Sequence, residues 1–237
     1  MSLKLNLRLV ALIVGVAAVG SSLIGGPAQA NQRQRPRTTT TKPKPEKPKP
    51  TGPTIWNDPG AVENLDFING AGGPDRAPKP PFMFLRDDPG GTNPKIKVTD
   101  AAGQEWGVKW GPEVHPEVFA SRIAWAAGYW VEPSYFVASG RVMGARGLSR
   151  AKKYVESDGS FTNARFELKE KGIERKTKEE SWRWDVNPFV GTPELNGLKI
   201  IMMLTSNWDP KDQSDDTSNT AIHIVRKTGE VRYVFGD

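Results

Sequence analysis

The sequence contains no cysteine among its 237 residues, and this absence removes several classes of chemistry at once. Disulfide bonds, cysteine-ligated zinc and thiol catalysis are all excluded. Histidine is almost as scarce, because only His115 and His223 occur and they lie far apart in the sequence. Neither histidine is surrounded by a recognisable catalytic motif, so we expect that neither acts in catalysis.

An excess of positive charge is missing from the part of the chain that can fold. The formal net charge is +6, but residues 31–54 alone hold seven basic residues against the single acid Glu46. Residues 55–237 hold 24 basic and 26 acidic residues and therefore have a net charge of −2. The high isoelectric point belongs to a tail, so the sequence predicts no nucleic-acid partner for the folded part.

A long hydrophobic run is also lacking, since the apolar stretch Leu9–Val19 is short for a membrane-spanning helix. Lys4 and Arg8 precede this stretch, and the small-residue sequence Pro27-Ala28-Gln29-Ala30 follows it. The pattern is typical of a cleavable secretory signal peptide over residues 1–30. We therefore expect a secreted or periplasmic protein.

Residues 31–54 offer no side chain for burial in a core apart from those of proline. They are rich in Pro, Lys, Arg and Thr, and residues 42–50 repeat the Lys-Pro pair. This composition predicts a disordered linker with extended polyproline character. Its positive charge suits an electrostatic contact with an anionic envelope surface, although an inert spacer is the simpler explanation.

Strand and helix patterns begin at residue 82, and the Gly- and Pro-rich residues 55–81 before it predict an irregular lead-in. Three strands are expected near Phe82–Leu85, Ile96–Val98 and Glu105–Trp110. In the third strand, the alternation puts three apolar side chains on one face and Lys109 on the other.

A helix is predicted from Pro116 to Ala127, because proline favours the first helical turn and Gly128 is a typical residue after the last one. The expected apolar face of this helix consists of Phe119, Ile123 and Ala126 or Ala127.

The second half of the chain predicts less regular structure before its last two elements. A strand is expected at Tyr135–Val137, whereas residues 140–180 contain few apolar side chains and predict a loop with a surface hairpin. A helix should begin at Thr192-Pro193-Glu194, with Thr192 as its cap. Its expected buried residues are Leu195, Leu198, Ile201, Met202 and Leu204 or Thr205. A hairpin of Ala221–Val225 and Val231–Phe235 follows, so the fold class is α+β.

The first three expected strands and the helix after them have the order needed to hold phosphate groups. Backbone N–H groups of a Gly-rich turn approach phosphates closely. A lysine on the third strand neutralises phosphate charge, and a glutamate on the next helix holds that lysine in place. The candidates are Gly90, Gly91, Thr92, Lys109, Glu117 and, as a rival to Glu117, Glu113. An exposed strand lysine and a glutamate that favours a helix N-terminus are the simpler alternative.

A polar loop rich in carboxylates follows the second helix. It holds Asp209, Asp212, Asp215, Asp216 and Asn219, and the hairpin after it leads to Asp237. In Mg-phosphate chemistry one carboxylate orients a hydroxyl, while an amide and a second carboxylate hold the metal. The alternative is an acidic loop that is merely solvated.

Several motifs carry a resemblance to a known family. In the first half they are Gly91-Thr92-Asn93-Pro94-Lys95, Val108-Lys109, Pro116-Glu117 and Trp125-Ala126. In the second half they are Asn207-Trp208-Asp209, Lys211-Asp212 and Tyr233-Val234-Phe235-Gly236-Asp237. Together they resemble a family of secreted bacterial proteins similar to the protein kinase-like superfamily, in the style of the HipA-type and phosphatidylinositol kinases. The resemblance covers about residues 82–237.

The resemblance implies a kinase-like N-lobe, formed by a small antiparallel sheet and one helix, and an incomplete C-lobe of helix, catalytic-type loop and β-hairpin. It implies that Lys109 binds the phosphates of ATP. The other implied roles are orientation of an unknown acceptor by Asp209 or its rival Asp212, and Mg binding by Asn219 and Asp237, with Asp215 and Asp216 as alternative ligands. No activation segment follows Asp237, so the resemblance implies a truncated domain.

Two kinds of function follow from this interpretation. The first is a Mg-nucleotide-dependent phosphotransferase or an inactive truncated remnant of one. The second is a non-catalytic binding or scaffold module of the cell envelope that has kept the fold. A carbohydrate-binding module that uses the many tryptophans is disfavoured, because two helices are expected in place of an all-β pattern. Trp182 and Trp184 resemble a ligand-stacking pair, but buried aromatic residues of a strand are the commoner case.

Overall fold

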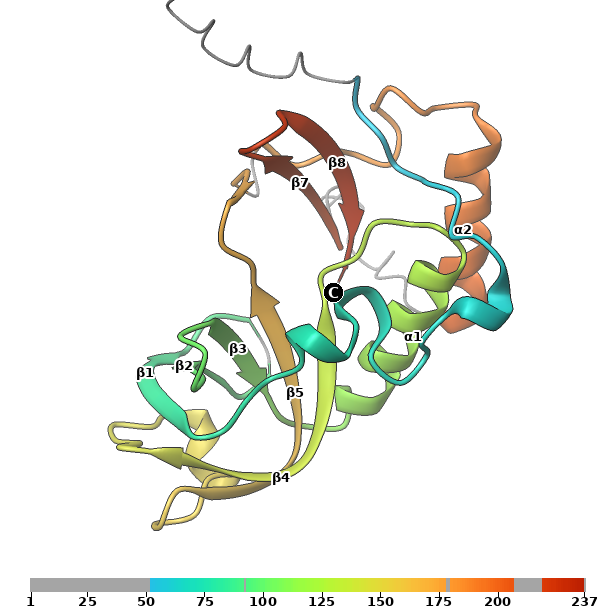
Figure 1. The fold of residues 1–237 in the computed structure, drawn as a ribbon. Helices are drawn as coiled ribbons and strands as arrows, with labels where there is room; N and C mark the ends of the chain where they lie inside the picture. The colour runs from blue at the N-terminus through green and yellow to red at the C-terminus, as the bar shows by residue number, and fades with distance from the viewer. Residues whose placement is uncertain (1–51, 92, 178–179, 207–218, 237) are drawn as a thin grey trace, which may run out of the picture. The chain divides into compact units, whose positions relative to one another are not determined.

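Five strands close into a barrel in the computed structural model, which describes residues 52–91, 93–177, 180–206 and 219–236 (Figure 1). The strands are Phe82–Asp88 (β1), Lys95–Thr99 (β2), Glu105–Lys109 (β3), Ser134–Met143 (β4) and Ser160–Lys169 (β5). Their order around the barrel is β1–β2–β3–β5–β4. Neighbouring strands are antiparallel except β1 and β4, which close the barrel through the parallel pairs Phe82–Val142 and Met83–Met143.

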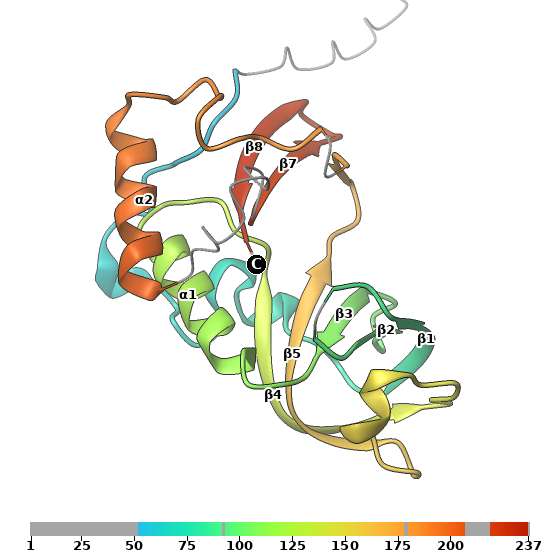
Figure 2. The same cartoon turned by 180° about the vertical axis from the view of Figure 1, so that it is seen from behind.

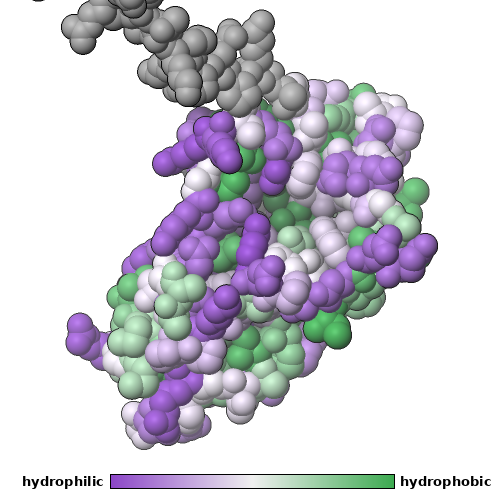
Figure 3. All heavy atoms as spheres, viewed as in Figure 1, coloured by the Kyte–Doolittle hydropathy of each residue, from purple (hydrophilic) through white to green (hydrophobic). Residues whose placement is uncertain are grey.

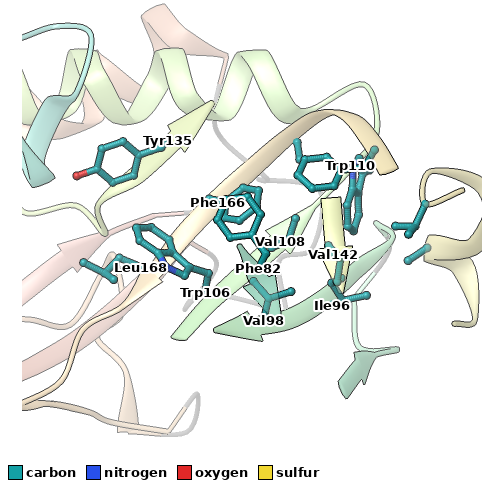
Figure 4. Close-up of a cluster of buried hydrophobic side chains, with 14 residues drawn as sticks. Phe82, Ile96, Val98, Trp106, Val108, Trp110, Tyr135, Val142, Phe166 and Leu168 are labelled. Atoms are coloured by element: carbon teal, nitrogen blue, oxygen red, sulfur yellow. The ribbon is translucent and has the colours of Figure 1, made fainter. Parts of the chain in front are cut away.

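The barrel forms because its strands turn alternate apolar side chains inwards. In β3 the buried residues Trp106 and Val108 face the interior, while the outward residues between and beside them include Lys109. Phe166 of β5 packs at the centre, with its ring centroid 4.7 Å from that of Phe82 and 6.0 Å from that of Trp106 (Figure 4). Such aromatic side chains each bury on the order of 150–250 Å² and supply much of the apolar burial in a small core.

The prediction of a loop and a surface hairpin for residues 140–180 was wrong. This region contains the end of β4 and all of β5, and β5 lies between β3 and β4 in the barrel. The alternation in β5 is interrupted because Asn163 has a positive φ of 50°. Phe161 and Ala164 therefore both face inwards although they are three residues apart, which hides the strand from a search for period two.

Two α-helices, Val114–Ala126 (α1) and Pro193–Thr205 (α2), lie side by side in both views of the ribbon (Figures 1 and 2). The predicted start of α2 is confirmed, since Leu195 N donates a hydrogen bond of 3.3 Å to Thr192 Oγ1. Within the described part of the chain, neither helix is long and apolar enough to cross a membrane.

The expected apolar face of α1 was wrong. Phe119 is 59% exposed, and the buried residues of the helix are Val114, Glu117, Ala120, Arg122 and Ala124. The helix packs against β4 and β5, where it meets the polar outer surface of the barrel. Small alanines and the charged Glu117 therefore occupy the buried side, where the sequence pattern predicts large apolar residues.

A second, antiparallel sheet joins Ile173–Arg175 (β6) to the predicted hairpin of Thr220–Val225 (β7) and Glu230–Phe235 (β8). Trp182 is buried in the core beside this sheet, and its indole N–H donates a hydrogen bond of 3.1 Å to Val234 O. The alternative of a buried structural tryptophan is thus confirmed for Trp182.

The remaining helical segments are short. The 3-10 helices are Val62–Asn64, Gly70–Gly72, Pro74–Arg76 and Arg150–Lys153. The first three belong to the lead-in, which is irregular as predicted and contains the buried Ile55. On the face shown in Figure 3, hydrophilic residues cover much of the surface and hydrophobic ones form smaller patches between them.

Candidate functional site

Lys109 points away from the barrel interior and towards α1. Its side chain is 14% exposed and forms an ion pair with Glu117 Oε1. Its Nζ also lies 3.3 Å from Glu113 Oε2. The ion pair predicted from the sequence is therefore present, and both rival carboxylates take part. The Glu117 side chain is only 6% exposed, whereas that of Glu113 is 51% exposed, so Glu117 is the buried anchor.

Arg165 makes Glu117 the centre of a larger charge network. This arginine lies directly opposite Lys109 in the β3–β5 ladder, and its Nη1 is 2.7 Å from Glu117 Oε2. Its Nη2 is 2.6 Å from Glu167 Oε2 on the same strand. Sequence reasoning missed Arg165 because β5 was not recognised as a strand. The outward alternation of Arg165 and Glu167 between buried apolar residues was the available signal.

The Gly-rich turn between β1 and β2 is held from outside by Arg150. The Arg150 guanidinium donates hydrogen bonds of 2.7 Å to Gly91 O, 2.5 Å to Pro89 O and 3.1 Å to Gly90 O. Gly91 has a positive φ of 64°, which favours glycine. Thr92, the third candidate of this turn, lies outside the described residues. Arg150 has no sequence signature and could be found only in the structure.

A cleft of about 470 Å³ lies over the outer face of β2, β3 and β5. Three of the sequence candidates, Gly91, Lys109 and Glu113, line it. The other lining residues are Asn93, Lys95, Lys97, Gly107, Glu132, Arg165, Glu167 and Lys169. None of these described residues has an apolar side chain, so the cleft suits a polar or charged ligand.

Glu132, which precedes β4, is a second centre of charge that sequence reasoning missed. Its carboxylate lies 3.4 Å from Lys169 Nζ, 2.7 Å from Arg175 Nε and 3.4 Å from His223 Nε2. Burial on its own raises the pKa of the Glu132 carboxyl, but Lys169, His223 and Arg175 hold that pKa well below its ordinary value. The cleft therefore contains an ionised Glu132 at neutral pH.

The end of β8 lies beside Glu117 and Arg165. A small cavity of about 30 Å³ is lined by Glu117 and Arg165 on one side and by Phe235 and Gly236 on the other. Gly236 N also donates a hydrogen bond of 3.1 Å to Asn219 O. Asn219 is thus a neighbour of Gly236, and Gly236 lines the same small cavity as Glu117.

The remaining sequence candidates lie outside the described residues. These are Asp209, Asp212, Asp237 and the alternative ligands Asp215 and Asp216. Within the described ranges, no group of three or more His, Asp or Glu residues is arranged to hold a metal ion.

The chain was compared with protein-family models, with curated proteins and with solved structures, and none of the three comparisons found a match. The resemblance to kinase-like proteins therefore rests on the sequence motifs quoted above alone.

Proposed function

We propose that this chain is a kinase-like protein, exported through its signal peptide to the periplasm or the exterior, whose cleft binds the phosphate groups of a Mg-nucleotide. The observation that carries the proposal is the pairing of Lys109 with the buried Glu117 beside the Gly-rich turn. Transfer of a phosphoryl group to an acceptor is the activity that this arrangement serves.

The ion pair supports phosphate binding because it fixes the position of a charged donor. A lysine side chain is flexible and loses rotamer entropy when a ligand orders it. Glu117 already holds the Lys109 ammonium on the cleft side of β3, and Arg165 holds Glu117 from the other side. A phosphate that enters the cleft therefore meets a preoriented ammonium.

The order of the elements also supports the proposal. A strand, a Gly-rich turn, two strands with Lys109 on the second and a helix with Glu117 follow one another, in the order of the N-lobe that the resemblance implies. The closed barrel, with its parallel pairing of β1 and β4, departs from the small antiparallel sheet that the resemblance implies. The closure leaves the outer face of β3, which carries Lys109, free to line the cleft.

The proposal assigns Mg to Asn219 and Asp237 and orientation of the acceptor to Asp209 or Asp212. The hydrogen bond between Gly236 and Asn219 fits this assignment, since it brings the residue before Asp237 next to Asn219. A carboxylate and an amide oxygen are suitable ligands for Mg. The ion would neutralise phosphate charge, while Lys109 and the Gly-rich turn would bind the remaining phosphate oxygens.

Isothermal titration calorimetry with MgATP tests the proposal. Lys109→Ala should weaken binding by roughly 1–3 kcal/mol, the range for a charge-assisted hydrogen bond. Lys152→Ala is the matched control, because Lys152 is an exposed lysine of the 3-10 helix 150–153. Wild-type affinity in Lys109→Ala, or no binding of MgATP at all, would refute the proposal.

The alternative is a non-catalytic binding or scaffold module of the cell envelope. The absence of apolar side chains among the described lining residues favours it, because a nucleotide base is normally held by apolar surface. An assay of γ-phosphate transfer from MgATP, phosphatase-coupled or with a radiolabel, separates the two functions. Binding of MgATP without any transfer of its γ-phosphate to water or to an added acceptor would favour the non-catalytic module.

A further inference from the structure

Four outward positions on β2 and β3 form the floor of the cleft. The strand register pairs Lys95 with Lys109 and Lys97 with Gly107. Three of the four positions are therefore lysines, and the fourth is a glycine. We call the space over this glycine the Gly107 notch.

The notch exists because Gly107 has no side chain. Its φ is not among the positive values of the described chain, so the backbone there does not require glycine. A Cβ built at this position would lie 3.1 Å from Lys97 Nζ and 3.7 Å from Lys169 Cε. Glycine within a strand weakens the strand and often marks the close approach of a ligand. The glycine thus keeps space open between two lysine side chains.

The lysines around the notch have carboxylates beside them, but cations are in excess, because the described lining of the cleft holds five cationic side chains against three carboxylates. Lys95 and Lys109 lie directly opposite each other, an arrangement of like charges that destabilises a sheet. Lys95 forms no ion pair with any residue that the structure describes. Burial and the charge of Lys169 lower the pKa of Lys97, against the opposing effects of Glu167 and of Asp88, whose Oδ2 lies 3.4 Å from the Lys97 ammonium. An anion bound between these groups would relieve their repulsion.

The same floor offers nothing to a nucleotide base. Bases are held by stacking on apolar or aromatic side chains. Here Lys97, Gly107 and Glu167 occupy neighbouring outward positions on β2, β3 and β5, and Lys169 follows at the end of β5.

We infer that the Gly107 notch is a second anion subsite beside Lys109, and that the ligand of the cleft is an oligophosphate or a similar polyanion with at least two charged groups bound on β2 and β3. This inference rests on the proposed phosphate-binding function and names its ligand class. The base of a nucleoside polyphosphate would then make no contact with these strands.

Calorimetry with three probes in the presence of Mg²⁺ tests the inference: inorganic tripolyphosphate, ATP and adenosine. Tripolyphosphate should bind wild-type protein within about threefold of ATP, and adenosine should not bind, because the charged groups alone supply the contacts. Gly107→Val fills the notch and Lys97→Gln removes one of its charges. Each variant should weaken tripolyphosphate binding about tenfold or more, the factor that corresponds to ~1.4 kcal/mol.

Lys152→Gln is the matched control for the loss of a lysine charge and should bind tripolyphosphate as wild type does. Urea denaturation of Gly107→Val checks that the variant is folded, and Lys97→Gln keeps the test valid if it is not. If Lys109→Gln weakens binding while ATP binds more than tenfold tighter than tripolyphosphate, this inference is overturned and the proposed function stands. If no phosphate probe binds, both are overturned.

Discussion

Arg165 of β5 lies directly opposite Lys109 of β3, and the two cations share the carboxylate of Glu117 on α1. Like charges that face each other on neighbouring strands destabilise a sheet. The arrangement is tolerated because the buried carboxylate of Glu117, on α1, contacts both cations. A charge network of this kind joins the helix to the barrel at the point where we propose that phosphate binds.

Removal of the Glu117 charge should cost more stability than removal of an exposed acid. Glu117→Gln removes the buried anion that Lys109 and Arg165 share, and breaking a buried pair costs on the order of 3–5 kcal/mol. Urea denaturation measures the free energy of unfolding. The control is Glu113→Gln, for which a loss below about 1 kcal/mol is expected because this side chain is half exposed. Equal losses would contradict the role of Glu117 as the shared anion.

The ionisation of Glu132 should make stability depend on pH. The pKa of this carboxyl is lower in the folded protein than its ordinary value of 4.5, so its contribution is present above about pH 4.5. That contribution is lost as the pH falls through the folded-state pKa. Glu132→Gln should therefore be less stable at neutral pH and should lose less further stability on acidification than wild type. Urea midpoints at about pH 7, 5 and 3 test this, and parallel curves for the two proteins would exclude it.

Arg150 should matter for binding more than for folding. Its guanidinium holds three carbonyl oxygens of the Gly-rich turn, and a typical hydrogen bond contributes about 0.5–1.5 kcal/mol. Arg150→Ala is expected to weaken phosphate binding several-fold and to speed hydrogen exchange at the amides of Gly90 and Gly91. Arg146→Ala is the control, because Arg146 is an exposed arginine of the same β4–β5 connection. Unchanged exchange and affinity in Arg150→Ala would show that the turn holds its conformation alone.

Gly128 should not tolerate a side chain. It has a positive φ of 94°, and a Cβ there would overlap the Asn57 carbonyl oxygen and the Trp56 indole nitrogen. Gly128→Ala is expected to lower the free energy of unfolding by at least ~1 kcal/mol, because both the backbone and the lead-in must shift. Gly52→Ala, at a site with no atom within 4 Å of the new Cβ, should leave stability within about 0.5 kcal/mol of wild type.

Local patterns in the sequence predicted the elements that depend on local physics. Strict alternation identified β3 and placed Lys109 on the face opposite its apolar side chains, and Thr192-Pro193-Glu194 identified the start of α2. The pairing of Lys109 with Glu117 could be expected because strand, turn and helix follow one another within a few residues.

Long-range features could not be predicted in this way. Asn163 breaks the alternation of β5, so the strand that supplies Arg165 was missed. Phe119 was placed in the core because a helical pattern does not reveal that the surface facing α1 is charged. Arg150 acts on a turn about 60 residues earlier in the chain, and no spacing rule connects the two. The expected acidic loop around Asp209 lies outside the described residues and stays a prediction.

The ion pairs of Glu132 have a mechanical consequence. Lys169 is the last residue of β5 and Arg175 is the last residue of β6. The Glu132 carboxylate therefore forms ion pairs on both sides of the short connection between the barrel and the second sheet. His223 of β7 adds a contact from the next strand. Any rotation of the second sheet against the barrel must stretch at least one of these contacts. Protonation of this single carboxyl group would therefore weaken the contacts that join the barrel to the second sheet.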